Sequence, residues 1–110
     1  MLDLVPGQIA TLERFSRAGF KLVSLAHVER YLGLEKDGFV ALLEPAEGKL
    51  RVFGQVGLRM GEGIGMLVER GAGKAFVWKK ESVVATPTLL EGYEHFRNEV
   101  RALLEIGSQQ

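Results

Sequence analysis

The residues most suggestive of chemistry are glycines. The stretch GLRMGEGIGMLVERGAGK, residues 57–74, holds six of the fourteen glycines of the chain. A phosphate loop of the Walker type needs a serine or threonine after its lysine and then a helix, whereas an alanine and a strand pattern follow Lys74. The dinucleotide fingerprint fails too, because Gly61, Gly63 and Gly65 have the wrong spacing. We therefore expect these glycines in hairpin turns and strand bends, and we expect no cofactor.

The residues around His95 raise the question of a metal site. His95 has Glu91 and Glu99 one helical turn on either side, and imidazole with carboxylates can bind a transition metal. Acidic and basic neighbours at this spacing are also normal on a solvated helix face, and no second cluster supplies further ligands. The chain has no cysteine, which excludes thiolate zinc sites, iron–sulfur clusters and disulfides. We expect no metal.

Catalysis by a nucleophile has no motif in the sequence. No serine or threonine lies in a nucleophile-elbow pattern, and Ser24 and Thr86 are placed to cap helices. The fourteen acidic residues offer many pairs for acid–base work, but nothing marks any pair as buried. We therefore predict no catalytic residues.

The composition is that of one ordinary globular domain, residues 1–110. Hydrophobic residues make up 46% and charged residues 25%, which allows a core without cross-links. The formal net charge is zero, so no global electrostatic argument favours nucleic acid or anionic lipid. The first ten residues do not resemble a secretory signal, and no apolar run approaches the roughly 20 residues that a membrane span needs. We expect a cytoplasmic protein that does not enter the membrane.

The apolar spacing predicts an α+β fold that begins with two helices. The first covers about residues 6–18, where Pro6 suits the first helical position and Gly19 suits a left-handed stop. The second covers about residues 24–32, capped by Ser24 and ended by the following glycine.

The rest of the chain is predicted to form a sheet and a closing helix. Short apolar runs and tight turns over about residues 38–85 predict an antiparallel sheet or small barrel of four to five strands. Residues 49–60 alternate as one long strand that bends at Gly54 or Gly57. The final helix covers about residues 87–105 and packs on the sheet.

The final helix carries one apolar stripe, which serves as core, as a dimer contact, or as both. Its members are spaced alternately by four and three residues: Leu89, Tyr93, Phe96, Val100 and Leu103. Gly92 interrupts the helix, and a close approach to the sheet would explain it.

One face of the predicted sheet could carry aromatic and basic side chains together. By strand alternation its members are Arg51, Phe53, Arg59, Phe76, Trp78 and Lys80. Single-stranded nucleic acid stacks its bases on such surfaces. The final helix must also bury its stripe, and the same face is the obvious place; we favour this core interpretation.

A second nucleic-acid hypothesis concerns residues 24–45. The segment has an apolar pattern like that of a helix-turn-helix. The predicted second helix would be its first helix, and EKDGFVALLEP would be its recognition helix. Lys36 is the only basic residue that such a recognition helix would offer to phosphates, which disfavours the hypothesis.

The function that these patterns favour is a non-enzymatic binding or accessory module that acts through protein contacts and forms a homodimer. The alternative is a nucleic-acid-binding regulator that uses the aromatic face or the helix-turn-helix-like segment. An enzyme of undetermined class ranks third.

Overall fold

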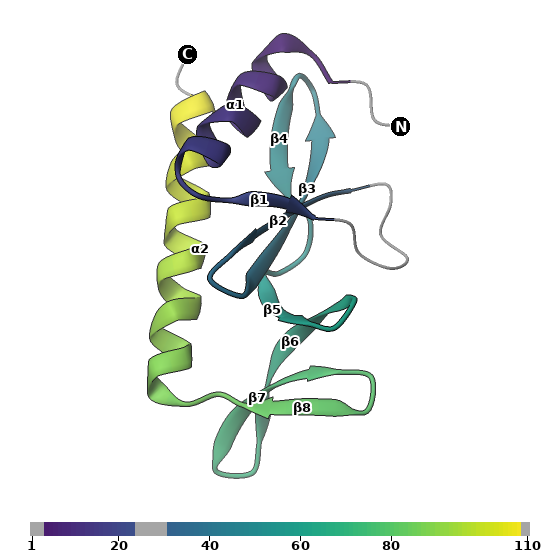
Figure 1. The fold of residues 1–110 in the computed structure, drawn as a ribbon, viewed down its shortest axis with the longest axis vertical. Helices are drawn as coiled ribbons and strands as arrows, with labels where there is room; N and C mark the ends of the chain where they lie inside the picture. Colours follow the sequence, from purple (N-terminus) through teal and green to yellow (C-terminus); the bar gives the residue numbers. More distant parts are fainter. Residues whose placement is uncertain (1–3, 24–30, 109–110) are drawn as a thin grey trace.

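The computed structural model describes residues 4–23 and 31–108, which form a helix, eight strands and a second helix (Figure 1). In chain order the elements are α1 (Pro6–Arg17), β1 (Lys21–Val23), β2 (Leu32–Lys36), β3 (Phe39–Ala46), β4 (Lys49–Val52), β5 (Gly57–Met60), β6 (Gly63–Arg70), β7 (Gly73–Trp78), β8 (Glu81–Val84) and α2 (Pro87–Ser108).

The strands form one antiparallel sheet in the order β1-β2-β3-β5-β6-β7-β8, and β4 pairs with β3 beside this path. β3 changes partner along its length: Phe39 and Val40 pair with β5, and residues 43–46 pair with β4. β6 likewise pairs first with β5 and then with β7. These changes curl the sheet into a half-barrel. In Figure 1, α2 runs along the length of this sheet and α1 lies near the C-terminal end of α2.

The α+β class, the first helix and the final helix are confirmed, but the strand count is higher than predicted and the sheet starts earlier, at Lys21. The first helix ends as expected, with Gly19 at φ 95°. The predicted second helix over about 24–32 falls mostly outside the described residues. Where the structure describes it, the prediction is wrong, because Leu32 and Gly33 belong to β2.

The predicted recognition helix of the helix-turn-helix-like segment 24–45 is also wrong. Its residues form the hairpin of β2 and β3, in which Leu34 pairs with Ala41 and Lys36 with Phe39. Asp37 and Gly38 make the turn with φ of 55° and 86°, values that an α-helix does not contain. An Asp-Gly pair between apolar runs is a strong hairpin signal, and here it outweighs the helix-like spacing of the apolar residues.

The predicted twelve-residue strand over 49–60 is two strands, β4 and β5, joined by a bend where Gly54 has φ 67°. The alternation nevertheless persists across the break. Leu50 and Val56 are buried, whereas Phe53 and Gln55 are exposed. The bend therefore redirects the chain without exchanging its buried and exposed sides.

The apolar stripe of α2 lies in the core against the concave side of the sheet. Tyr93, Phe96 and Val100 are exposed by only 5%, 3% and 1%. The Phe39 ring lies 6.1 Å from the Tyr93 ring and 5.9 Å from the Phe96 ring, centre to centre. A Cβ at Gly92 would lie 3.1 Å from the Phe39 ring, so this glycine does permit close approach of α2 to β3.

The glycine-rich stretch forms turns and closely packed strands, as its chemistry predicted. Gly61 and Gly71 occupy hairpin turns with φ of 59° and 58°. Strands lie on both sides of each turn, so no helix begins there. Within β6, a Cβ on Gly63 would overlap the indole ring of Trp78, which therefore packs directly on the glycine backbone. The stretch thus shapes the core of the C-terminal hairpins.

This packing predicts that Gly63→Ala destabilises the fold by about 1–3 kcal/mol, because the added methyl displaces Trp78. Gly73→Ala is the matched control: Gly73 begins β7, and no atom lies within 4 Å of its added Cβ. The control is expected to change stability by less than about 1 kcal/mol. Urea unfolding followed by circular dichroism measures both variants, and equal stabilities would contradict the packing of Trp78 on Gly63.

Candidate functional site

The aromatic residues of the predicted nucleic-acid face lie on different sides of the sheet. Phe76 is fully buried, 5.4 Å from the Tyr93 ring of α2, and half-buried Trp78 packs against the same core. Phe53 is instead 42% exposed and stacks on Tyr31, with ring centres 4.1 Å apart. Tyr31 packs against the small second core of the opposite face. The core interpretation therefore fits Phe76 and Trp78, but not Phe53.

The basic residues of that predicted face are also dispersed, and two are paired with acids. The Arg51 Nε donates to the Glu44 carboxylate at 2.6 Å, and an Arg59 Nη donates to Glu35 at 2.8 Å. Lys80 is exposed beyond the end of β7. The structure therefore does not bring the six predicted residues together as one aromatic and basic surface.

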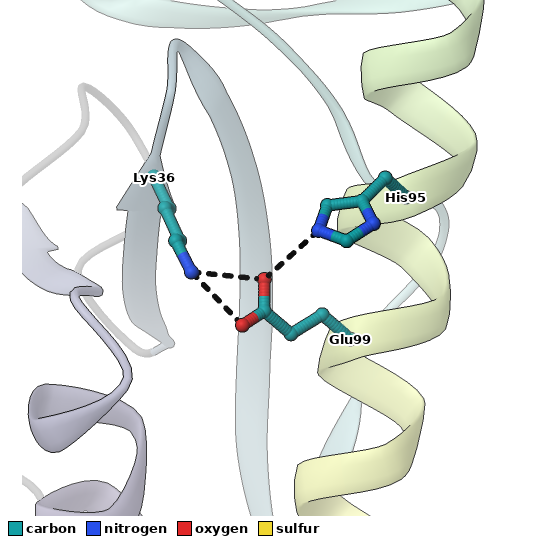
Figure 2. A network of polar contacts seen from close by, with 3 residues as sticks. All are labelled: Lys36, His95 and Glu99. Carbon is teal, nitrogen blue, oxygen red and sulfur yellow. Dashed lines mark hydrogen bonds and ion pairs between the residues drawn. The ribbon is translucent and has the colours of Figure 1, made fainter.

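A polar network joins the sheet to α2 near its middle (Figure 2). The Lys36 Nζ reaches from β2 to both carboxylate oxygens of Glu99, at 3.0 and 2.9 Å. The same ammonium lies 5.1 Å from the centre of the Phe20 ring. The His95 Nε2 is 3.9 Å from Glu99, but its side chain is 78% exposed.

This network links β2 to α2, and we call its ion pair between Lys36 and Glu99 the clamp. Because Lys36 engages both oxygens of Glu99, that carboxylate joins β2 to α2. Glu91, the other carboxylate weighed for a metal, is exposed. Within residues 4–23 and 31–108, no three histidine, cysteine or acidic side chains are grouped so that they could hold a metal ion.

Several exposed apolar side chains of the C-terminal strands lie on the face that α2 does not cover. Met66 of β6 pairs with Val77 of β7. Val68 of β6 pairs with Ala75 of β7, which in turn pairs with Val84 of β8. The alternate residues of β6 and β7, among them Phe76, point to the core, so this set points outward. We call it the outer patch: Met66, Val68, Val77 and Val84. Their exposure reaches 37% at Met66, 39% at Val68 and 73% at Val84.

The outer patch borders the free edge of β8. Among the described strands, β8 is the last of the sheet and pairs only with β7. The Ala85 amide donates to the Lys74 carbonyl at 2.9 Å, so by alternation the amides of Ser82 and Val84 point away from β7. A groove of about 450 Å³ separates β8 from residues 58–60 of β5. Within the described residues the Ser82 and Val84 amides have no backbone partner, although the Val84 carbonyl accepts from the Thr86 amide at 3.1 Å.

Sequence reasoning missed this surface because it considered only the face of the C-terminal strands that carries Phe76 and Trp78. The sequences IGMLVER and AFVWKK are apolar at both odd and even positions, which indicates strands with two apolar faces. That signal could have located the outer patch, although not the register that aligns its members.

Comparison of the chain with protein-family models, with curated proteins and with solved structures gave no significant match. Of the two described helices, neither is long and apolar enough to cross a membrane.

The clamp between Lys36 and Glu99 predicts a measurable coupling. A double-mutant cycle with Lys36→Met and Glu99→Gln is expected to give about 1–2 kcal/mol, because both side chains are only 24% exposed. The surface pair of Glu13 and Arg17, exposed by 62% and 76%, is the control and is expected to give about 0.3 kcal/mol. Unfolding in urea measures both cycles, and coupling no larger than the control would contradict the clamp.

Proposed function

We propose that this chain is a non-enzymatic binding module of the cytoplasm that acts through protein contacts and associates with a second copy of itself. The observation that carries the proposal is the outer patch beside the outward-pointing amides of Ser82 and Val84 on the edge of β8. The absence of cysteine suits a reducing compartment and supports the cytoplasmic assignment.

A strand from another chain can pair with an exposed sheet edge and so extend the sheet, particularly where apolar side chains lie beside the edge. Edge strands offer backbone groups to an incoming strand, and apolar side chains beside them add affinity. β8 has both features, since the amides of Ser82 and Val84 point outward and Val84 is 73% exposed. The protein contact that we propose is therefore strand pairing along β8.

A second copy fits this edge by antiparallel pairing around a two-fold axis at Val83. In that register Val83 lies opposite its own counterpart, and Ser82 lies opposite Val84 of the other copy. Opposed residues keep the same face, so the two outer patches become continuous across the joint. Glu81 then lies opposite Ala85, and Lys80 opposite Thr86. No two like charges are opposed, which would otherwise destabilise the pairing.

The final helix is a poorer route to the same association. Three members of its stripe, Tyr93, Phe96 and Val100, are almost fully buried within the chain itself. A coiled-coil contact through them would have to expose the core first. The geometry therefore favours the sheet edge over the helix as the surface for the homodimer.

The proposal predicts that the chain sediments as a dimer whose dissociation depends on protein concentration, and that Val84→Lys shifts it to monomer. A lysine at this position places two ammonium groups close together at the joint and removes apolar contact. Analytical ultracentrifugation over a dilution series measures the shift.

Ile9→Lys is the control, because Ile9 is an apolar residue of α1 that is 44% exposed and lies outside β8 and the outer patch. It is expected to leave the dimer intact. A wild-type chain that stays monomeric at high concentration, or equal effects of the two lysines, would overturn self-association through β8.

A further inference from the structure

A cavity of about 540 Å³ opens between β4, the loop that follows it, and α2. No residue of β8 or of the outer patch lines it, so it is independent of the proposed association. Its volume falls within the roughly 300–1,000 Å³ of small-molecule sites. We propose that this cavity binds a small amphiphilic carboxylate, meaning an apolar chain or ring that ends in one carboxylate group.

The floor of the cavity suits the apolar part of such a ligand. Leu50, Val52 and Val56 line it from the sheet side, and Val100 and Leu104 line it from α2. Aliphatic walls offer no hydrogen bonds, so a ligand gains there by removing its own apolar surface from water. A purely polar ion would gain nothing from this floor.

The rim of the cavity suits the anionic end. Three arginines, Arg51, Arg97 and Arg101, line the cavity, whereas the acidic residue in its lining is Glu105. A guanidinium has five N–H donors in a planar fork that matches a carboxylate. The rim therefore offers three guanidinium groups and one carboxylate where it meets the apolar floor.

Two of the three arginines are already oriented by neighbours. Arg97 donates to Glu94 at 3.0 Å and lies 5.6 Å from the centre of the Tyr93 ring. Arg51 donates to Glu44 through its Nε, and its terminal nitrogens make no hydrogen bond with the described residues. Each pair thus holds a guanidinium in place and uses only part of its donors.

Arg101 is the anchor that we assign to the carboxylate. Its side chain makes no ion pair or hydrogen bond with the described part of the chain, although it lines the cavity one helical turn from Arg97. A guanidinium without an internal partner can give both arms of its fork to a ligand. The bound carboxylate would lie between Arg101 and Arg97, with the apolar body on the floor.

The experiment titrates the full chain with octanoate and with 3-phenylpropanoate, and follows backbone amide shifts by NMR. These probes distinguish an aliphatic from an aromatic body. Octan-1-ol and acetate are the controls, because each lacks one half of the proposed chemistry. We expect shifts at residues 50–56 and 97–104, with octanoate or 3-phenylpropanoate bound at least about tenfold more tightly than either control.

The variant Arg101→Gln is expected to weaken binding of the tighter probe by about five- to tenfold, because it removes a charged bidentate donor. Arg70→Gln is the matched control, since Arg70 is an exposed arginine at the end of β6 and does not line the cavity. Circular dichroism verifies that both variants fold.

Three outcomes would overturn the proposal. They are binding of octan-1-ol as tight as that of both carboxylates, equal effects of the two arginine variants, and the absence of saturable shifts at the cavity with either carboxylate. Since sedimentation tests the β8 edge separately, failure here leaves the proposed association intact.

Discussion

The packing of α2 against the aromatic rings of β3 and β7 holds the two halves of the sheet in place. Phe39 lies at the centre, with ring contacts of 6.3 Å to Phe76, 6.1 Å to Tyr93 and 5.9 Å to Phe96. β3 belongs to the first half of the sheet and β7 to the second, so α2 fastens both halves of the curl. Gly92 makes this approach possible by leaving space for the Phe39 ring.

Polar contacts then fix the position of the helices at the edges of this core. Lys36 ties β2 to Glu99 of α2, and Arg14 of α1 donates to the Leu103 carbonyl at 3.1 Å. The Gln8 side chain donates to the Lys49 carbonyl of β4 at 2.9 Å. Because the helices cover the concave side, the convex side keeps its own apolar residues. The outer patch is therefore a consequence of a strand set that is apolar on both faces.

The sequence predicted those elements in which one periodicity dominates. The 4-3-4-3 stripe located α2, and the Leu89 amide donates to Thr86 as the predicted cap, at 3.2 Å. The alternation over 49–60 predicted which side chains share a face, even though the chain bends at Gly54. An extended segment was predicted where β1 lies, but β2 was not predicted, because the spacing of Tyr31 and Leu32 with earlier apolar residues fits a helix equally well. Leu32 is in a strand rather than a helix because β2 pairs with β3, and local sequence spacing does not report such pairing.

The candidate surfaces were harder to predict than the fold, since they depend on which face is covered. We expected Phe53 and Phe76 on one face, but β4 and β7 are not neighbours in the sheet, and the two rings lie on opposite faces. The sequence did not predict the cavity, because the cavity lies between β4 and residues of α2 that are about 50 positions further along the chain. Long-range closure of this kind leaves no periodic signal.

We propose that the stripe of α2 belongs to the core of each chain and that β8 carries the association. Amide hydrogen exchange at low and high protein concentration tests it most directly. We expect slow exchange at Tyr93, Phe96 and Val100 that is the same at both concentrations, and exchange at Ser82 and Val84 that slows as concentration rises. Exchange that slows in α2 while Ser82 and Val84 remain unchanged would contradict it.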